Sequence, residues 1–103
     1  METKPIERSD FLALNFYKKT DFYGSRGNMN YRLSRRERGE EGEKEAYFEL
    51  VYWPGPYNFA KTADNLKQNA EFPFSEEGIQ AATAFLNEQY VKQHELWELS
   101  AQN

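Results

Sequence analysis

The segment that most constrains the fold is residues 46–59, which read Ala-Tyr-Phe-Glu-Leu-Val-Tyr-Trp-Pro-Gly-Pro-Tyr-Asn-Phe. Aromatic and β-branched residues favour a strand, and the Pro-Gly-Pro turn ends it. Each aromatic side chain buries a large apolar area and can anchor the core of a small domain. The segment therefore predicts a central strand. It also leaves Trp53, Tyr57 and Phe59 beside a loop, where aromatic anchors often meet a protein partner.

Length and composition predict a single domain, 1–103, in which residues 1–8 form a flexible tail. Mean hydropathy is -0.96, which is typical of disordered chains, but aromatic residues make up 17% and disordered chains are poor in them. The chain has no cysteine, so we expect no disulfide and no thiolate chemistry. No signal peptide follows Met1, and no apolar run approaches the roughly 18 residues of a membrane span. We therefore expect a cytoplasmic protein that does not contact membranes.

Hydrophobic periodicity predicts an α+β fold with the order α-β-β-β-α. Ser9 and Ser75 are placed to cap the two helices, and residues 24–28 have the composition of a turn. A period of two from Met29 onward gives way to a helical period at Ser75. The predicted elements are a helix at 10–19, strands near 29–37, 44–53 and 69–74, and a helix at 76–98. We expect a three-stranded antiparallel sheet packed against the C-terminal helix, with Pro73 on an edge strand.

Charge is distributed unevenly along a chain whose net charge is -4. Residues 1–38 contain nine Lys/Arg and five Asp/Glu, whereas residues 39–103 contain four and twelve. Such an imbalance marks an interaction surface, or else the two halves neutralise each other in the folded domain. Around the Gly-Glu-Glu-Gly turn, we expect exposed ion pairs between the arginines before it and the glutamates after it. These residues are Arg35, Arg36, Arg38, Glu43 and Glu45.

The residue types that carry catalysis or bind metals are sparse. His94 is the only histidine and no cysteine accompanies it, so we expect no metal site and no cofactor. Glu76 and Glu77 are adjacent on a predicted helix, so their side chains diverge, and their place in its first turn explains both. No serine has a base that can be assigned to it. We therefore expect a protein that is not an enzyme.

The order α-β-β-β-α resembles the double-stranded-RNA-binding domain in topology. That family places lysines at the start of its second helix, where they meet phosphate. The matching stretch here is Ser75-Glu76-Glu77-Gly78. Carboxylates there repel a phosphate backbone. The resemblance therefore implies a similar fold without the RNA-binding activity.

Three further stretches resemble small uncharacterised proteins of Firmicutes, some of them on conjugative mobile elements. They are Asp10-Phe11-Leu12-Ala13-Leu14-Asn15-Phe16-Tyr17-Lys18-Lys19, Trp53-Pro54-Gly55-Pro56-Tyr57 and Phe72-Pro73-Phe74-Ser75-Glu76-Glu77-Gly78. Small acidic proteins on such elements include anti-CRISPR inhibitors, which bind the RNA-guided nuclease that they block. The resemblance implies a non-enzymatic inhibitor of a type II nuclease or of its guide loading.

The partner-binding residues of such an inhibitor would be the turn aromatics Trp53, Tyr57 and Phe59 together with the acidic helix residues Glu88, Glu95 and Glu98. The nuclease offers a positively charged channel to which an acidic helix is complementary. Two alternatives remain open at this point. One is a small adaptor protein, and the other is a nucleic-acid-binding regulator that uses Arg32, Arg35, Arg36 and Arg38.

Overall fold

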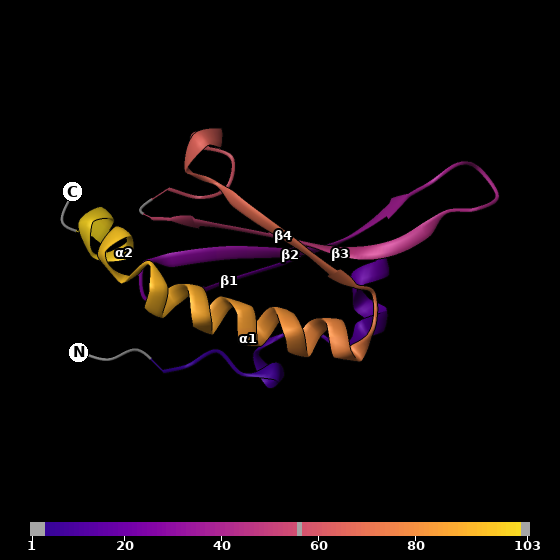
Figure 1. The fold of residues 1–103 in the computed structure, drawn as a ribbon, viewed down its shortest axis with the longest axis horizontal. Coiled ribbons are helices and arrows are strands. Elements are labelled where there is room, and N and C mark those ends of the chain that lie inside the picture. Colours follow the sequence, from indigo (N-terminus) through magenta and orange to yellow (C-terminus); the bar gives the residue numbers. More distant parts are fainter. Residues whose placement is uncertain (1–3, 56, 102–103) are drawn as a thin grey trace.

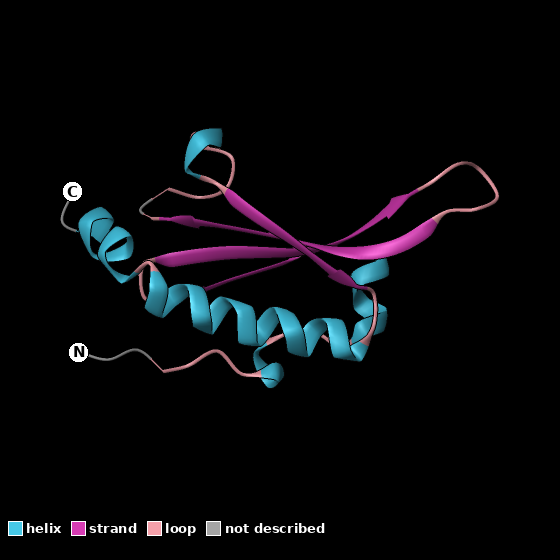
Figure 2. Ribbon diagram, in the orientation of Figure 1, coloured by secondary structure: helices cyan, strands magenta, loops and turns pink. Residues whose placement is uncertain are grey.

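The computed structural model describes residues 4–55 and 57–101, which form a four-stranded antiparallel sheet with one long helix across one face (Figure 1). The strands lie in the sheet in chain order. The elements are β1 (Phe22–Arg26), β2 (Met29–Arg38), β3 (Glu45–Pro54), β4 (Gln68–Pro73), α1 (Glu76–Lys92) and α2 (His94–Ala101). Figure 2 shows the two layers, helix below and strands above. The α+β class and the packing of the sheet on the C-terminal helix are thus confirmed.

The sheet has one strand more than we predicted. The stretch that we took for a turn, 24–28, contains most of β1, which pairs with β2 from Phe22↔Leu33 to Arg26↔Met29. Only Gly27 and Asn28 remain between the strands, and Gly27 takes a φ of 55°, which suits glycine in a tight hairpin turn. The prediction was wrong because two glycines close together resemble one long turn. The first of them, Gly24, instead lies within the strand beneath the Tyr31 ring.

The N-terminal helix predicted at 10–19 is absent from the described residues. The chain forms two short 3₁₀ turns, Arg8–Asp10 and Leu14–Lys18, with extended backbone at Phe11 and Ala13. Ten residues make a marginal helix, because nucleation is costly. Phe11 packs against Phe22, and the Tyr17 ring packs edge-on against Phe48 of β3. Six residues apart, Phe11 and Tyr17 would not share a helix face, so the extended segment buries both where a helix would bury one.

The C-terminal helix predicted at 76–98 is two helices. Ser75 caps α1 as predicted, since its Oγ accepts a hydrogen bond from the N–H of Gly78 at 3.1 Å. Gln93 then leaves the helical conformation, with φ -111° and ψ 28°, and its side chain accepts a hydrogen bond from Gln68 at 2.8 Å. The break turns α2 so that Trp97 is only 2% exposed. Its carbonyl accepts a hydrogen bond from Asn28 at 3.1 Å, which ties α2 to the β1–β2 turn.

The core lies between α1 and the sheet face that it covers. Leu86 and Ile79 of α1 are fully buried, as are Leu33 of β2 and Phe48 and Leu50 of β3. They occupy the faces that the periods of two and 3.6 predicted. The apolar residues that most constrained the fold in the sequence thus form its centre.

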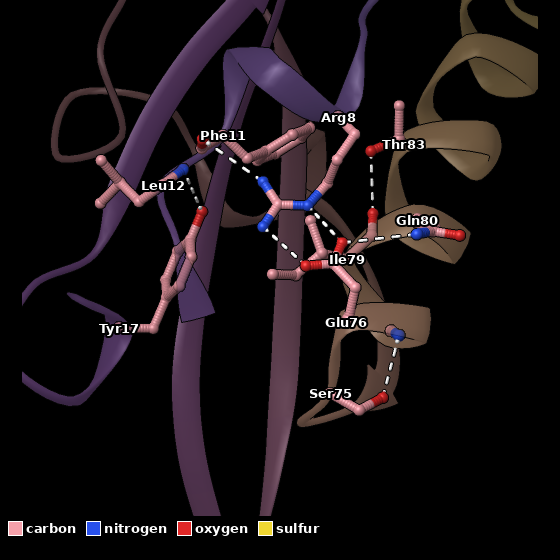
Figure 3. A network of polar contacts seen from close by, with 10 residues as sticks. Arg8, Phe11, Leu12, Tyr17, Ser75, Glu76, Ile79, Gln80 and Thr83 are labelled. Atoms are coloured by element: carbon pink, nitrogen blue, oxygen red, sulfur yellow. Dashed lines mark hydrogen bonds and ion pairs between the residues drawn. The ribbon is translucent and has the colours of Figure 1, made fainter. Parts of the chain in front are cut away.

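The N-terminal segment runs along α1 as a strap (Figure 1). The Asn87 side chain exchanges two hydrogen bonds with the backbone of Ile6, both at 2.9 Å. The Arg8 guanidinium donates to both carboxylate oxygens of Glu76, at 2.5 and 3.0 Å, and holds the pKa of that carboxyl below its usual value (Figure 3). We predicted a flexible tail at 1–8. Residues 1–3 lie outside the described part of the chain. Ile6 and Arg8 belong to the strap and are hydrogen-bonded to α1.

Among the residues that the structure describes, no helix is both long and apolar enough to cross a lipid bilayer.

Candidate functional site

The loop between β3 and β4 folds over the sheet face that lies opposite α1, which we call the outer face (Figure 1). Strand alternation places Arg32 of β2 and Trp53 of β3 on this face. The Phe59 ring from the loop meets Trp53 edge-on, with centroids 5.5 Å apart. The cations of Arg32 and Lys67 lie 4.1 and 3.9 Å from the Phe59 ring centroid. Phe59 is thus held between two cations over a buried indole.

Of the three predicted aromatic anchors, the structure leaves one largely exposed. Trp53 is 2% exposed, and Phe59 is half-buried in the cluster just described. Tyr57 is 60% exposed, yet its backbone is held in place. Its carbonyl accepts hydrogen bonds from Trp53 Nε1 at 2.9 Å and from Thr62 Oγ1 at 3.3 Å. Trp53 therefore contributes by bracing the loop, and Tyr57 presents its ring to solvent from a fixed position.

Three of the four arginines singled out in the sequence pair closely with carboxylates, Arg32 and Arg38 across strands and Arg35 with Glu37 of its own strand. Arg32 is 8% exposed and lies 2.8 Å from Glu49. Arg38 lies opposite Glu45 in the strand register, but its guanidinium pairs with Glu71 of β4 at 2.6 Å. The predicted pairing of Arg35, Arg36 and Arg38 with Glu43 and Glu45 was therefore wrong. It considered only the glutamates next to the turn, whereas the carboxylates that pair with Arg35 and Arg38 are Glu37 of β2 and Glu71 of β4.

The three glutamates predicted to bind a partner are exposed but divided between the two helices. Glu88 lies on α1 and pairs with Lys92 at 2.6 Å. Glu95 and Glu98 lie on α2, where the Glu98 carboxylate is 3.1 Å from Nε2 of His94. The break at Gln93 changes the direction of the helix axis between them, so they do not form the single straight acidic face that a continuous helix would present.

A pocket of about 350 Å³ opens on the outer face, between β1, β2, β3 and the loop. None of the described residues that line it is charged. On this face its walls carry three aromatic rings and two side-chain amides, from Tyr23, Trp53, Phe59, Asn30 and Asn58. Tyr31 also lines it, but the Tyr31 ring packs against Phe11 and Phe22 in the core. Burial raises the pKa of the Tyr31 hydroxyl to about 12, so this ring stays neutral. We call this space the aromatic pocket.

A second pocket, of about 460 Å³, shares Tyr23 with the first and lies toward the start of β1. The described residues that line it contribute four cations and one carboxylate, from Lys18, Lys19, Arg35, Arg36 and Asp21. We call it the cationic pocket. Sequence reasoning missed Lys18, Lys19 and Tyr23 as a site. The Lys-Lys pair was visible, but only the pairing of β1 with β2 brings it beside Arg35 and Arg36.

The described residues that line the two pockets include aromatic, amide and cationic side chains and the carboxylate of Asp21. Within residues 4–55 and 57–101, no group of three or more His, Asp or Glu side chains is placed to hold a metal ion. His94 lies on α2 and lines neither pocket. Burial raises the pKa of Tyr17, so this ring too is neutral at physiological pH. The two pockets thus present rings, amides and cations at the surface.

Comparison with protein-family models, with curated proteins and with solved structures finds no match for this chain.

We expect the protein to bind duplex RNA or DNA weakly at physiological salt. Arg32 and Arg38 are paired with carboxylates, and residues 39–103 contain four Lys/Arg against twelve Asp/Glu, so a duplex releases few counterions on binding. A mobility-shift titration with duplexes of each kind measures this. Submicromolar affinity with a steep salt dependence would contradict it and favour the regulator that uses Arg32, Arg35, Arg36 and Arg38.

Proposed function

We propose that this protein is a non-enzymatic, protein-binding inhibitor of the anti-CRISPR type, acting on a type II RNA-guided nuclease or on its guide loading. The observation that carries the proposal is the braced, exposed ring of Tyr57. A rigid aromatic side chain that is already held in position loses little conformational entropy on binding. Such residues are frequent hot spots of protein interfaces.

The exposed carboxylates of the C-terminal helices support the choice of partner. Glu77, Glu88, Glu95 and Glu98 are exposed on α1 and α2. Exposed charges of one sign accelerate association with a surface of the opposite sign. An RNA-guided nuclease carries its nucleic acid in a positively charged channel. The resemblance of three segments to mobile-element proteins points to the same class of target.

Inhibition of DNA cleavage by purified type II nucleases tests the proposal. We expect inhibition by this protein, and adding it before or after the guide RNA separates an effect on guide loading from an effect on the assembled complex. Several nuclease orthologues are needed, since inhibitors discriminate among targets. Absence of inhibition in both orders, across all orthologues, would contradict the proposal and leave an adaptor or regulator with another target.

Two sets of variants separate the effect of surface charge on association from the effect of the aromatic anchor on dissociation. Reversing Glu88, Glu95 and Glu98 to Lys is expected to slow association and to change its salt dependence without affecting folding, because all three are exposed. Tyr57→Ala is expected to raise the dissociation rate by roughly tenfold or more, as for a truncated interface anchor. Tyr57→Phe is the matched control, since it keeps the ring. Phe59→Ala is less informative, because Phe59 also packs on Trp53.

A further inference from the structure

The two pockets meet at one side chain. Tyr23, which is 56% exposed, lines both the aromatic pocket and the cationic pocket. It lies on β1, so the two spaces follow each other along that strand. We propose that they form one bipartite site for a nucleotide unit, with the base in the aromatic pocket, the phosphate in the cationic pocket and Tyr23 between them. The proposal goes beyond the proposed inhibition of a nuclease and does not depend on it.

The cationic pocket has N–H donors that can bind an oxyanion. Lys18 and Lys19 are exposed, and within the described residues neither ammonium has a hydrogen-bond or ion-pair partner. Arg36 is only loosely paired, with its guanidinium 3.7 Å from Glu49 and 3.9 Å from Asp21. These distances exceed a normal hydrogen bond, so N–H groups remain to bind a phosphate. Arg35 is committed to Glu37 at 2.8 Å and contributes charge more than donors.

The aromatic pocket has the rings and amides that recognise a nucleobase, and these groups are not needed to bind a phosphate. Aromatic rings stack on a base whatever its identity, and Tyr23, which is 56% exposed, presents such a ring. The Phe59 ring, which lies between Arg32 and Lys67, and the buried Trp53 form the wall beside it. The Asn30 and Asn58 side chains carry amides, which can pair with donors and acceptors on a base edge. Asn58 Oδ1 accepts from the N–H of Lys61 at 3.0 Å, which leaves its amide N–H groups for the ligand. The described residues that line this half of the site are uncharged, so it meets a ligand through rings and amides.

The combination of the two pockets argues against ligands that suit only one of them. An acidic peptide matches the cations but gains nothing from the aromatic walls, and an apolar side chain matches the walls but gains nothing from the cations. A nucleotide presents both chemistries side by side. A base in a duplex is stacked and paired, so the site selects free nucleotides or single strands. The weak duplex binding expected above is therefore compatible with it.

Fluorescence anisotropy with a labelled single-stranded RNA octamer of mixed sequence, at low salt, tests the site in the full-length protein. We expect saturable binding that weakens steeply with salt. Competition with AMP, with adenosine and with inorganic phosphate separates the sources. Displacement by AMP at concentrations similar to the octamer assigns a free nucleotide. Displacement only by longer strands assigns single-stranded nucleic acid. Either result supports the proposal.

Variants on each half make the result specific. We expect Tyr23→Ala, and separately Lys18→Glu with Lys19→Glu, to weaken binding by roughly tenfold each. Tyr23→Phe keeps the stacking ring and is expected to bind almost as the parent does. Lys44→Glu with Lys92→Glu is the matched control, because it changes the net charge equally at exposed positions outside both pockets. Thermal unfolding by circular dichroism verifies that each variant is folded.

Three outcomes would overturn the proposal. The first is no binding of the octamer or of AMP at millimolar concentration. The second is equal weakening by the control pair, which would show that only net charge matters. The third is binding that Tyr23→Ala leaves unchanged, together with competition by a glutamate octapeptide or inorganic phosphate that is as strong as competition by AMP. This result would mean that the site binds anions in general and does not recognise a base. None of these outcomes bears on nuclease inhibition, which the cleavage assay measures separately.

Discussion

Leu86→Ala is expected to lower the free energy of unfolding by about 2–5 kcal/mol, the range for truncating a buried leucine. Leu86 is fully buried in α1, in the apolar cluster between that helix and the sheet. The change removes apolar area from the core and leaves a cavity, because neighbours on a rigid sheet relax only partly. Urea unfolding followed by circular dichroism measures the loss as a lower midpoint.

Val91→Ala is the matched control for this experiment. Val91 lies on the same helix but is 69% exposed, so we expect a change below about 0.5 kcal/mol in either direction. A loss from Leu86→Ala no larger than that of the control would mean that α1 packs on the sheet through a different face. The fold described above would then be wrong at its centre.

Gly78→Ala is expected to destabilise the protein by about 1–3 kcal/mol, although alanine favours a helix by about 1 kcal/mol over glycine. Gly78 lies in the first turn of α1, where the helix passes directly over the end of β4. A Cβ built there would lie 1.8 Å from the backbone oxygen of Pro73 and 2.9 Å from its carbonyl carbon. A side-chain rotation cannot relieve an overlap with backbone, so the helix must move away from the strand.

The reverse change elsewhere on α1 shows which effect dominates. Ala81→Gly, at an exposed position, is expected to cost about 1 kcal/mol through helix propensity alone. If propensity also governed residue 78, Gly78→Ala would raise the unfolding midpoint by about as much as Ala81→Gly lowers it. An increase in stability for Gly78→Ala would therefore exclude the close approach of α1 to β4. Both variants are compared in the same urea titration.

The candidate site was only partly predictable from the sequence. Tyr57 was recognisable as an aromatic residue after a turn, and the structure leaves it exposed. The hydrogen bond that holds Tyr57 in place was not recognisable from the sequence. It joins the indole N–H of Trp53 to a carbonyl four residues later, through a loop of irregular conformation. The ion-pair partners of the arginines were not predictable either, because we expected them beside the hairpin turn. Arg38 is instead paired with Glu71, which is 33 residues away.

The sequence by itself determined β2, β3, β4 and the start of α1. Their signals are local: alternation along a strand, a proline at an edge, and a serine cap before an apolar stripe. Only the tertiary structure decided β1, the conformation of residues 10–19 and the break at Gln93. In each case a distant partner outweighs a weak local preference: Leu33 for Phe22, Phe48 for Tyr17 and Gln68 for Gln93. The two pockets that meet at Tyr23 belong to this second group, because strand pairing and loop folding bring their walls together from separate parts of the chain.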